Sequence, residues 1–457
     1  MTGPSKHPAE GNRPRRVRDP RSDKQKRKDV VGVERQLKGF RERDRHRKPL
    51  LDAVTRRRTG DSRRLQFEVA KIAEESLVVR GEILVRSDHA EAVGEALKGT
   101  GFENDGSVEC LKDRVTRFVN RGADVDALTE AWKKARKADR RASLNPLTPL
   151  GPIAKGMFGP ELSSVSSSYQ PPVGDGESVV PVAVIDTGIT AELRSDGWLT
   201  RVPRASDNID PLNALGRDPF LDFGAGHGTF ASGVIQQVAG DVADIMMYRA
   251  IDSDGVGSDV DVACALITAV KDGARIVNLS LGSETPDNEP PLALEVALQI
   301  IDKSDSDAVI VAAAGNSGGE RKCWPAAFSD TFERVVAVAG LDASHEGAAW
   351  STRGDWVTFS TVGEGILSTY VEGEESTEID PEPDHFPASS WAVWTGTSFA
   401  CPQVVGEIAL RLAASPGQLP SDVVTALENS SPKVAKWGTK LDILEGTKLD
   451  IPEDPSS

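Results

Sequence analysis

The chain has 457 residues with 42 glycines and 28 prolines, and 39% of its residues are hydrophobic, which is typical of a turn-rich globular protein rather than a disordered one. The length allows two or three domains. No run reaches 18 continuous apolar residues, so we expect neither a membrane-spanning helix nor a membrane partner.

Charge is distributed very unevenly along the chain. Residues 1–65 contain 22 Lys and Arg against 9 Asp and Glu, a balance of +13, whereas the remaining chain holds 32 against 61, or −29. We expect residues 1–65 to form a basic, largely disordered arm with one polar helix over 31–58. Such an arm is either simply solvated or contacts nucleic acid or another anionic partner.

The chain start and the cysteines indicate a cellular location. The first residues are charged and lack the apolar segment of a secretory signal, so we expect a cytoplasmic protein. Cys110, Cys264, Cys323 and Cys401 are scattered without a CxxC pair, which argues against zinc and against a disulfide framework. No cofactor and no metal are predicted, and the oligomeric state cannot be derived from the sequence.

Residues 66–142 are predicted to form a small α/β module. Strand-like and helix-like segments alternate in it: LVVRGEILVR (77–86), HAEAVGEALKG (89–99), VTRFVN (115–120) and DVDALTEAWKKARKA (124–138). A Pro- and Ser-rich linker is expected over 143–177, beginning with SLNPLTPLGP.

Strands and helices then alternate over 178–431, which predicts an α/β fold with a parallel sheet and helices on both faces. The expected strands are VVPVAVID and the segments 243–251, 274–281, 308–314 and 334–340. Ligands of such sheets bind beyond the carboxyl ends of the strands, where Asp186, Ser280 and Asn316 fall. Residues 432–457 are expected to be a peripheral polar tail.

Three short segments carry the residues needed for nucleophilic acyl transfer. They are VAVIDTGI around Asp186, GAGHGTFASGV around His227 and TGTSFACPQVVG around Ser398. A serine hydroxyl is a weak nucleophile unless an imidazole takes its proton, and a carboxylate must hold that imidazole in the correct tautomer. We therefore expect Ser398 to be the nucleophile, His227 the general base and Asp186 the orienting carboxylate. Ser398 also opens a helix, whose dipole favours negative charge there.

The order Asp, His, Ser matches the subtilisin arrangement, and the segments IVNLSLGS (276–283) and AAAGNSGG (312–319) agree with it. On these motifs, residues 178–430 resemble the subtilases, the subtilisin-like serine peptidases. The resemblance implies a subtilisin-like fold and a serine endopeptidase that acts on protein or peptide substrates.

The resemblance also implies further site residues. Asn316 would donate a side-chain N–H to the oxyanion, with the backbone N–H of Ser398 as second donor. The two walls of the substrate cleft would be Ser280, Leu281 and Gly282 on one side, and Ala313 and Gly315 on the other. The module at 66–142 lies where the family carries an inhibitory prodomain; an unrelated partner-binding or packing domain is the alternative.

Some residues depart from the family pattern or suggest additional sites. Phe399, Cys401 and Gln403 are unusual for the serine segment, and we expect them to affect packing and not catalysis. Asp207, Asp210 and Asp222 form either a calcium site or a solvated acidic face. A further hypothesis places Asp259 and Asp261 beside a bound peptide, which would favour basic substrates.

The expected function is an intracellular endopeptidase that is latent or narrowly directed, because an active protease would damage its own compartment. The module, tethered through 143–152, is placed to cover the cleft at a high local concentration. The alternative is a catalytically silent or partner-binding scaffold whose basic arm contacts an anionic partner.

Overall fold

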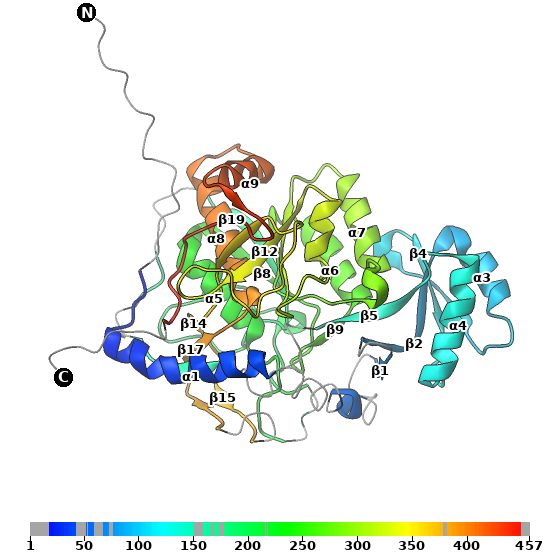
Figure 1. Ribbon diagram of the computed structural model, residues 1–457, viewed down its shortest axis with the longest axis horizontal. Coiled ribbons are helices and arrows are strands. Elements are labelled where there is room, and N and C mark those ends of the chain that lie inside the picture. The colour runs from blue at the N-terminus through cyan, green and yellow to red at the C-terminus, as the bar shows by residue number, and fades with distance from the viewer. Residues whose placement is uncertain are drawn as a thin grey trace, which may run out of the picture.

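A computed structural model shows an α/β body with a smaller module projecting from one side (Figure 1). The structure describes residues 18–42, 52, 54–58, 67–72, 76–149, 159–165, 169–172, 178–214, 216, 218–377 and 382–448. Among these residues, no helix is both long and apolar enough to cross a membrane.

The body is built on an eight-stranded sheet in the order β18-β19-β13-β12-β11-β10-β7-β8. All neighbouring strands are parallel except β18 and β19. The predicted parallel α/β sheet is therefore confirmed. The strands are β7 (Val180–Asp186), β8 (Ala243–Arg249), β10 (Ile276–Leu279), β11 (Val309–Ala313), β12 (Val335–Leu341), β13 (Phe359–Val362), β18 (Lys433–Val434) and β19 (Gly438–Lys440).

Helices cover both faces of this sheet. Successive strand residues point to opposite sides and are apolar on both, so each face has a hydrophobic surface to bury. In β7, Val182 and Val184 join one core cluster, whereas Ala183 and Ile185 join the other. The first cluster lies under α5 (His227–Ala239) and α8 (Thr397–Ala414), with α9 (Pro420–Glu428) beside α8. The second lies under α6 (Asp259–Lys271) and α7 (Leu292–Asp302).

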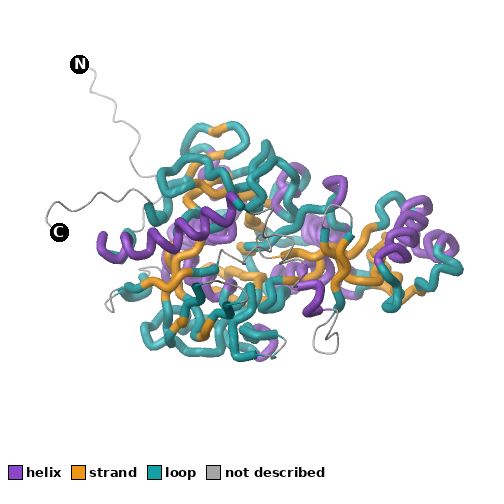
Figure 2. The backbone as a smooth tube through the Cα atoms, turned by 60° about the horizontal axis from the view of Figure 1, so that its bottom comes forward, coloured by secondary structure: helices purple, strands orange, loops and turns teal. Residues whose placement is uncertain are grey.

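The module is an antiparallel sheet in the order β3-β4-β2-β5, with β1 also paired to β2. Its helices lie on the side away from the body (Figure 2). Ile83 and Val85 of β2 pack under them, whereas Leu84 joins the core of α6 and α7. The elements are β1 (Val69–Lys71), β2 (Leu77–Arg86), α3 (Ala90–Ala96), β3 (Glu103–Ser107), β4 (Val115–Val119), α4 (Val125–Ala138) and β5 (Ser143–Pro149).

The first part of the expected linker is a strand. β5 pairs with β2 on one side and with β9 (Val256–Ser258) of the body on the other. Further along, β6 (Glu161–Ser163) pairs with β17 (Trp391–Trp394), which also pairs with β14 (Ile366–Thr369). A short hairpin joins β15 (Gly373–Glu374) to β16 (His385–Phe386). Residues 150–158, 166–168 and 173–177 of the expected linker lie outside the described residues.

The expectation of a largely disordered arm is wrong for residues 18–42. Helix α1 (Asp23–Arg41) begins with a capping box at Ser22 and lies across the body (Figure 1). Val33 and Leu37 enter the main core, and Phe40 stacks on Trp350. Their i, i+4, i+7 spacing gives one apolar stripe on an otherwise charged helix. The rest of the predicted arm lies outside the described residues, apart from 52 and 54–58.

The expected peripheral tail also belongs to the body as far as residue 448. β19 extends the main sheet beside β13, and Leu441, Ile443 and Leu444 are buried in the core. These few apolar residues were outnumbered by polar neighbours, so local composition concealed their burial. Residues 449–457 are outside the described ranges.

A disulfide links the module to the body, contrary to the prediction from cysteine spacing. Cys110 lies beside α6, in which its partner Cys264 is located, 154 residues further along the chain. Spacing could not indicate this pair because the two cysteines are brought together only when the module docks on α6. Cys323 and Cys401 are buried free thiols.

Candidate active site

Asp186 and His227 form a direct buried pair. Asp186 ends β7, His227 opens α5, and the His227 Nδ1 atom lies 2.8 Å from Oδ1 and 2.9 Å from Oδ2 of the carboxylate. The His227 side chain is 4% exposed and the Asp186 side chain is 0% exposed. The Thr187 backbone N–H donates to Asp186 Oδ1 at 2.7 Å. This arrangement holds the imidazole with Nε2 directed away from the carboxylate, as a general base requires.

Glycines around His227 allow this close approach. Gly226 has φ +74°, and a Cβ there would lie 2.7 Å from the Tyr370 ring. A Cβ on Gly228 would lie 2.3 Å from the Gly188 carbonyl oxygen. The GHG sequence therefore lets α5 begin against the segment that follows Asp186. The imidazole is then flanked by the rings of Trp394 and Phe399, with centroids at 5.4 and 5.3 Å.

Ser398 lies in the first turn of α8 and is anchored to the end of β10. Its Oγ donates to the Ser280 carbonyl oxygen at 3.0 Å, and its own carbonyl accepts from Ser280 Oγ at 2.8 Å. β10 is the direct neighbour of β7, which carries Asp186. The structure thus brings Asp186, His227 and Ser398 to the same carboxyl edge of the sheet.

Asn316 follows β11 and is oriented by Thr397. Its Oδ1 atom accepts from the Thr397 backbone N–H at 2.8 Å and from the Thr397 hydroxyl at 2.9 Å. Because the amide oxygen is engaged in this way, the Nδ2 group is the end of the side chain that can donate to a substrate oxygen. That orientation matches the predicted oxyanion donor.

The predicted cleft residues lie just beyond β10 and at the end of β11, but several side chains are in the core. Leu281 and Ala313 are buried members of the two core clusters, so any contact with a peptide must come from their backbones. A Cβ on Gly282 or on Gly315 would lie within 3.0 Å of the Cys323 sulfur. These two glycines therefore leave room for Cys323.

Sequence reasoning missed the role of Asp210. Its Oδ2 atom accepts from the Thr187 hydroxyl at 2.7 Å and from the Gly226 backbone N–H at 2.9 Å. It therefore bridges the residue after Asp186 and the residue before His227. Burial, with a smaller contribution from the charge of Asp186, raises the pKa of Asp210 to about 6.

The candidate calcium site does not form. Asp210 and Asp222 have separate partners, and Asp207 is exposed. Within the described ranges, no group of three or more His, Cys, Asp or Glu side chains is arranged to hold a metal ion. The alternative, a solvated acidic face, holds for Asp207 and is wrong for Asp210 and Asp222, which are buried.

The hypothesis that Asp259 faces a bound peptide is wrong. Its carboxylate is fully buried and accepts from the backbone N–H groups of Ala293 and Leu294, at the start of α7. Burial raises the pKa of Asp259 to about 7. Asp261 is bonded to Ser258 within its own helix start. Both carboxylates serve helix ends, and the predicted preference for basic substrates loses this support.

The unusual residues of the serine segment are packing residues, as predicted. Phe399 is a buried core residue. The Cys401 thiol contacts the Val311 carbonyl, and burial raises its pKa above the usual range. Gln403 donates to the carbonyl oxygens of Val362 and Phe399, both at 2.7 Å.

Comparison with known proteins agrees with this geometry. The subtilase family matches residues 177–447. Thermitase from Thermoactinomyces vulgaris is 28% identical over 291 residues, covering 62% of this chain and 90% of thermitase. A thermophilic serine proteinase from Bacillus sp. (strain AK1) is 28% identical over 385 residues, covering 80% of this chain and 86% of that protein.

A solved structure shows the same fold. Fervidolysin from Fervidobacterium pennivorans superposes with a TM-score of 0.54 at 19% identity, covering 83% of this chain and 61% of fervidolysin. Fold, site and relatives together define a serine endopeptidase. The chain belongs to the subtilase family.

Proposed function

We propose that this chain hydrolyses peptide bonds of protein or peptide substrates through an acyl-enzyme on Ser398. The observation that carries the proposal is the buried Asp186–His227 pair, whose imidazole lies against Phe399, the residue that follows Ser398 at the start of α8. His227 Nε2 takes the Ser398 hydroxyl proton as Oγ bonds to the scissile carbonyl carbon. Before this step, the hydroxyl must turn away from the Ser280 carbonyl, to which it now donates.

Charge that develops on the substrate is stabilised by groups already in place. The oxyanion accepts from Asn316 Nδ2 and from the Ser398 backbone N–H, next to the positive end of α8. His227 then gives its proton to the leaving amine as the C–N bond breaks. A water attacks the acyl-enzyme by the same route, with His227 again as base, and releases the carboxylic acid.

A second part of the proposal is latency. β5 adds to β9 in antiparallel register, with Leu147 opposite Ser258 and Pro149 opposite Val256. β9 follows a turn in which the Ser253 carbonyl accepts from Gly224, three residues before His227. The chain that leaves the module therefore runs as strand β5 next to β9, close to the segment that precedes His227. In this position the module would restrain the access of a peptide substrate to the site.

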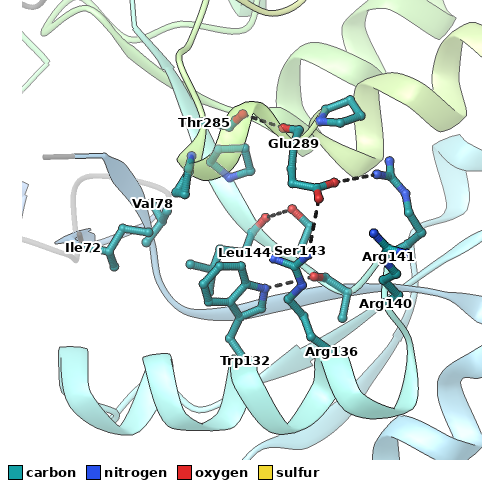
Figure 3. Close-up of a pocket in the computed structure, with 14 residues that line it drawn as sticks. Ile72, Val78, Trp132, Arg136, Arg140, Arg141, Ser143, Leu144, Thr285 and Glu289 are labelled. Atoms are coloured by element: carbon teal, nitrogen blue, oxygen red, sulfur yellow. Dashed lines mark hydrogen bonds and ion pairs between the residues drawn. The ribbon is translucent and has the colours of Figure 1, made fainter. Parts of the chain in front are cut away.

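Further contacts between the module and the body support this restraint. Glu289 accepts from both Arg136 and Arg141, at 3.4 and 3.1 Å, around the pocket between the two parts (Figure 3). The Cys110–Cys264 disulfide adds a covalent link. The cytoplasmic location stays a prediction, and this disulfide favours an oxidising compartment instead.

We also propose that the anionic partner of the basic arm is the acidic body of the same chain. Lys26 pairs with Glu445 at 3.3 Å, and Arg21 Nη1 donates to the Thr447 hydroxyl at 2.9 Å. Arg35 pairs with Glu161. These contacts join the basic arm to the acidic body within one chain, which supports an intramolecular partner over nucleic acid.

A serine-reactive fluorophosphonate probe tests the catalytic proposal directly. Wild-type chain should be labelled and should cleave a casein substrate, whereas Ser398→Ala should do neither. Ser421→Ala, in the distant helix α9, is the matched control and should behave as wild type. A wild-type chain that is neither labelled nor cleaves casein would instead be a catalytically silent scaffold, and equal labelling of the Ser398→Ala chain would rule out Ser398 as the nucleophile.

A further inference from the structure

A fully buried arginine from the N-terminal extension enters the catalytic domain. Arg58 Nε and Nη2 donate to the two oxygens of Asp254, both at 2.7 Å, and Nη2 also donates to Asp252 at 2.9 Å. The Arg58 side chain is 0% exposed. Its guanidinium lies over the Phe67 ring, 4.6 Å from the centroid. Arg58 thus anchors the N-terminal extension (residues 1–65) in a buried pocket of the body, formed by the turn 252–256 and called the socket below.

The socket carries more negative charge than one arginine. Asp222 lies in the same region, bonded to the Ser253 hydroxyl at 2.7 Å and to Arg57 at 2.9 Å. Burial raises the pKa of Asp222 and of Asp252, and the charge of Asp254 raises both further. Arg57 pairs with Asp222, and Arg249 pairs with Asp252 at 3.4 Å, so the loss of Arg58 would mainly leave the buried Asp254 carboxylate without its counter-charge.

The shape of the socket selects a guanidinium over an ammonium ion. Asp254 is engaged by two parallel N–H groups, which only a planar fork can supply. The Val256 carbonyl accepts from the same Nη2 at 3.2 Å, and Phe67 offers a ring face. Nη1 of Arg58 is buried and has no hydrogen-bond partner within the described part of the chain, so Nε and Nη2 provide the hydrogen bonds that hold the guanidinium.

The socket lies next to two other regions of the body: the segment 222–227, which leads to His227, and strand β9, which pairs with β5. Gly224 donates to Ser253 at 2.6 Å, and Asp252 donates to Val256, the first residue of β9. Phe223 and Val256 share a small core with Val54 of the extension. Occupancy therefore orders the turn that joins these two regions.

We propose that the turn 252–256, with Asp222, is a binding site for an arginine side chain, which Arg58 fills in the intact chain. Ligand recognition here does not depend on the hydrolytic activity, and it is tested by a readout other than turnover.

Arg58→Ala, made in the Ser398→Ala chain to prevent self-cleavage, empties the site. Its Tm should fall by about 5 °C or more because the buried Asp254 carboxylate loses its counter-charge. Methylguanidinium at up to about 50 mM should then raise this Tm by about 2 °C, while methylammonium at equal ionic strength should not. Arg35→Ala, which removes another arginine of the extension, should show no such response, and neither should the parent.

Two variants distinguish a site from simple charge neutralisation. Adding Asp254→Asn to Arg58→Ala should abolish the methylguanidinium response. Arg58→Lys should also lose Tm, because an ammonium cannot bond both Asp254 oxygens. Equal rescue by methylammonium, rescue that survives Asp254→Asn, or an Arg58→Lys chain as stable as the parent would each overturn the proposal. If Arg58→Ala is recovered only unfolded, the same comparison applies to its refolding yield from urea.

Discussion

Thr187 and Asp210 share a 2.7 Å hydrogen bond that joins the residue directly after Asp186 to a second, buried carboxylate. The Thr187 hydroxyl in turn accepts from the Gly228 backbone N–H at 3.1 Å. Asp210 also accepts from Gly226. The two segments that carry Asp186 and His227 are therefore held together by one side chain outside the triad.

This relationship predicts a pH-dependent contribution to stability. The pKa of Asp210 is raised from 3.8 to about 6, so protonated Asp210 favours the folded state. The stabilisation is fully present below about pH 4 and is lost as pH rises through about 6. Asp210→Asn, which stays neutral, should remove this dependence. Urea unfolding at pH 4.5 and pH 7.5 measures it; an unchanged difference between the two pH values would contradict the assignment.

The triad assignment predicts unequal losses of turnover. Ser398→Ala and His227→Ala should each lower kcat by about 10⁶-fold, and Asp186→Ala by about 10⁴-fold, because the carboxylate only orients the base. Kinetics on a fluorogenic peptide measure these changes, with circular dichroism confirming the fold. Turnover within tenfold of wild type in the Ser398 variant would be incompatible with the mechanism.

Asn316 should affect the transition state more than substrate binding. Asn316→Ala is expected to lower kcat by about 10² to 10³-fold. The substitution removes one hydrogen-bond donor to the oxyanion of the transition state, whereas the neutral carbonyl of the bound substrate is stabilised much less by that donor. KM should change little. A large rise in KM with kcat preserved would show that Asn316 binds the substrate uniformly instead.

Latency should depend on two restraints at once. A truncation beginning near Ser167 would also remove α1 and β6, which pack on the body, so the intact chain is the better test. With specific protease sites placed within 59–66 and within 150–158, α1 stays packed on the body, and cutting alone should leave activity low because the disulfide retains the module. Cutting followed by reduction should raise it.

The control for this experiment is a Cys110→Ser chain, which should be activated by cutting without any reductant. Activity is measured on the fluorogenic peptide, and retention of the module on a non-reducing gel. No gain in activity after the module has been released would make it a docking domain for a partner rather than an inhibitor.

The sequence by itself determined the parallel sheet and pointed to the candidate catalytic residues. Buried strands such as Val309–Ala313 are continuous apolar runs, which local pattern reveals. Because parallel strands end at one edge, Asp186, Ser280 and Asn316 were predicted to meet there. Their chemistry depends on residue type and order, both of which are visible in one dimension.

Only the tertiary structure decided which distant residues surround Arg58, Cys110 and Asp259. From the sequence alone, Arg58 is indistinguishable from a surface cation, but in the structure it is buried against Asp252 and Asp254. Cys110 has no cysteine nearby in the sequence, but in the structure it is bonded to Cys264 of α6. Asp259 reads as a cleft carboxylate until the start of α7 covers it. Each depends on partners between 34 and 196 residues away. Local periodicity and composition carry no information about such contacts, which form only when separately folded elements pack.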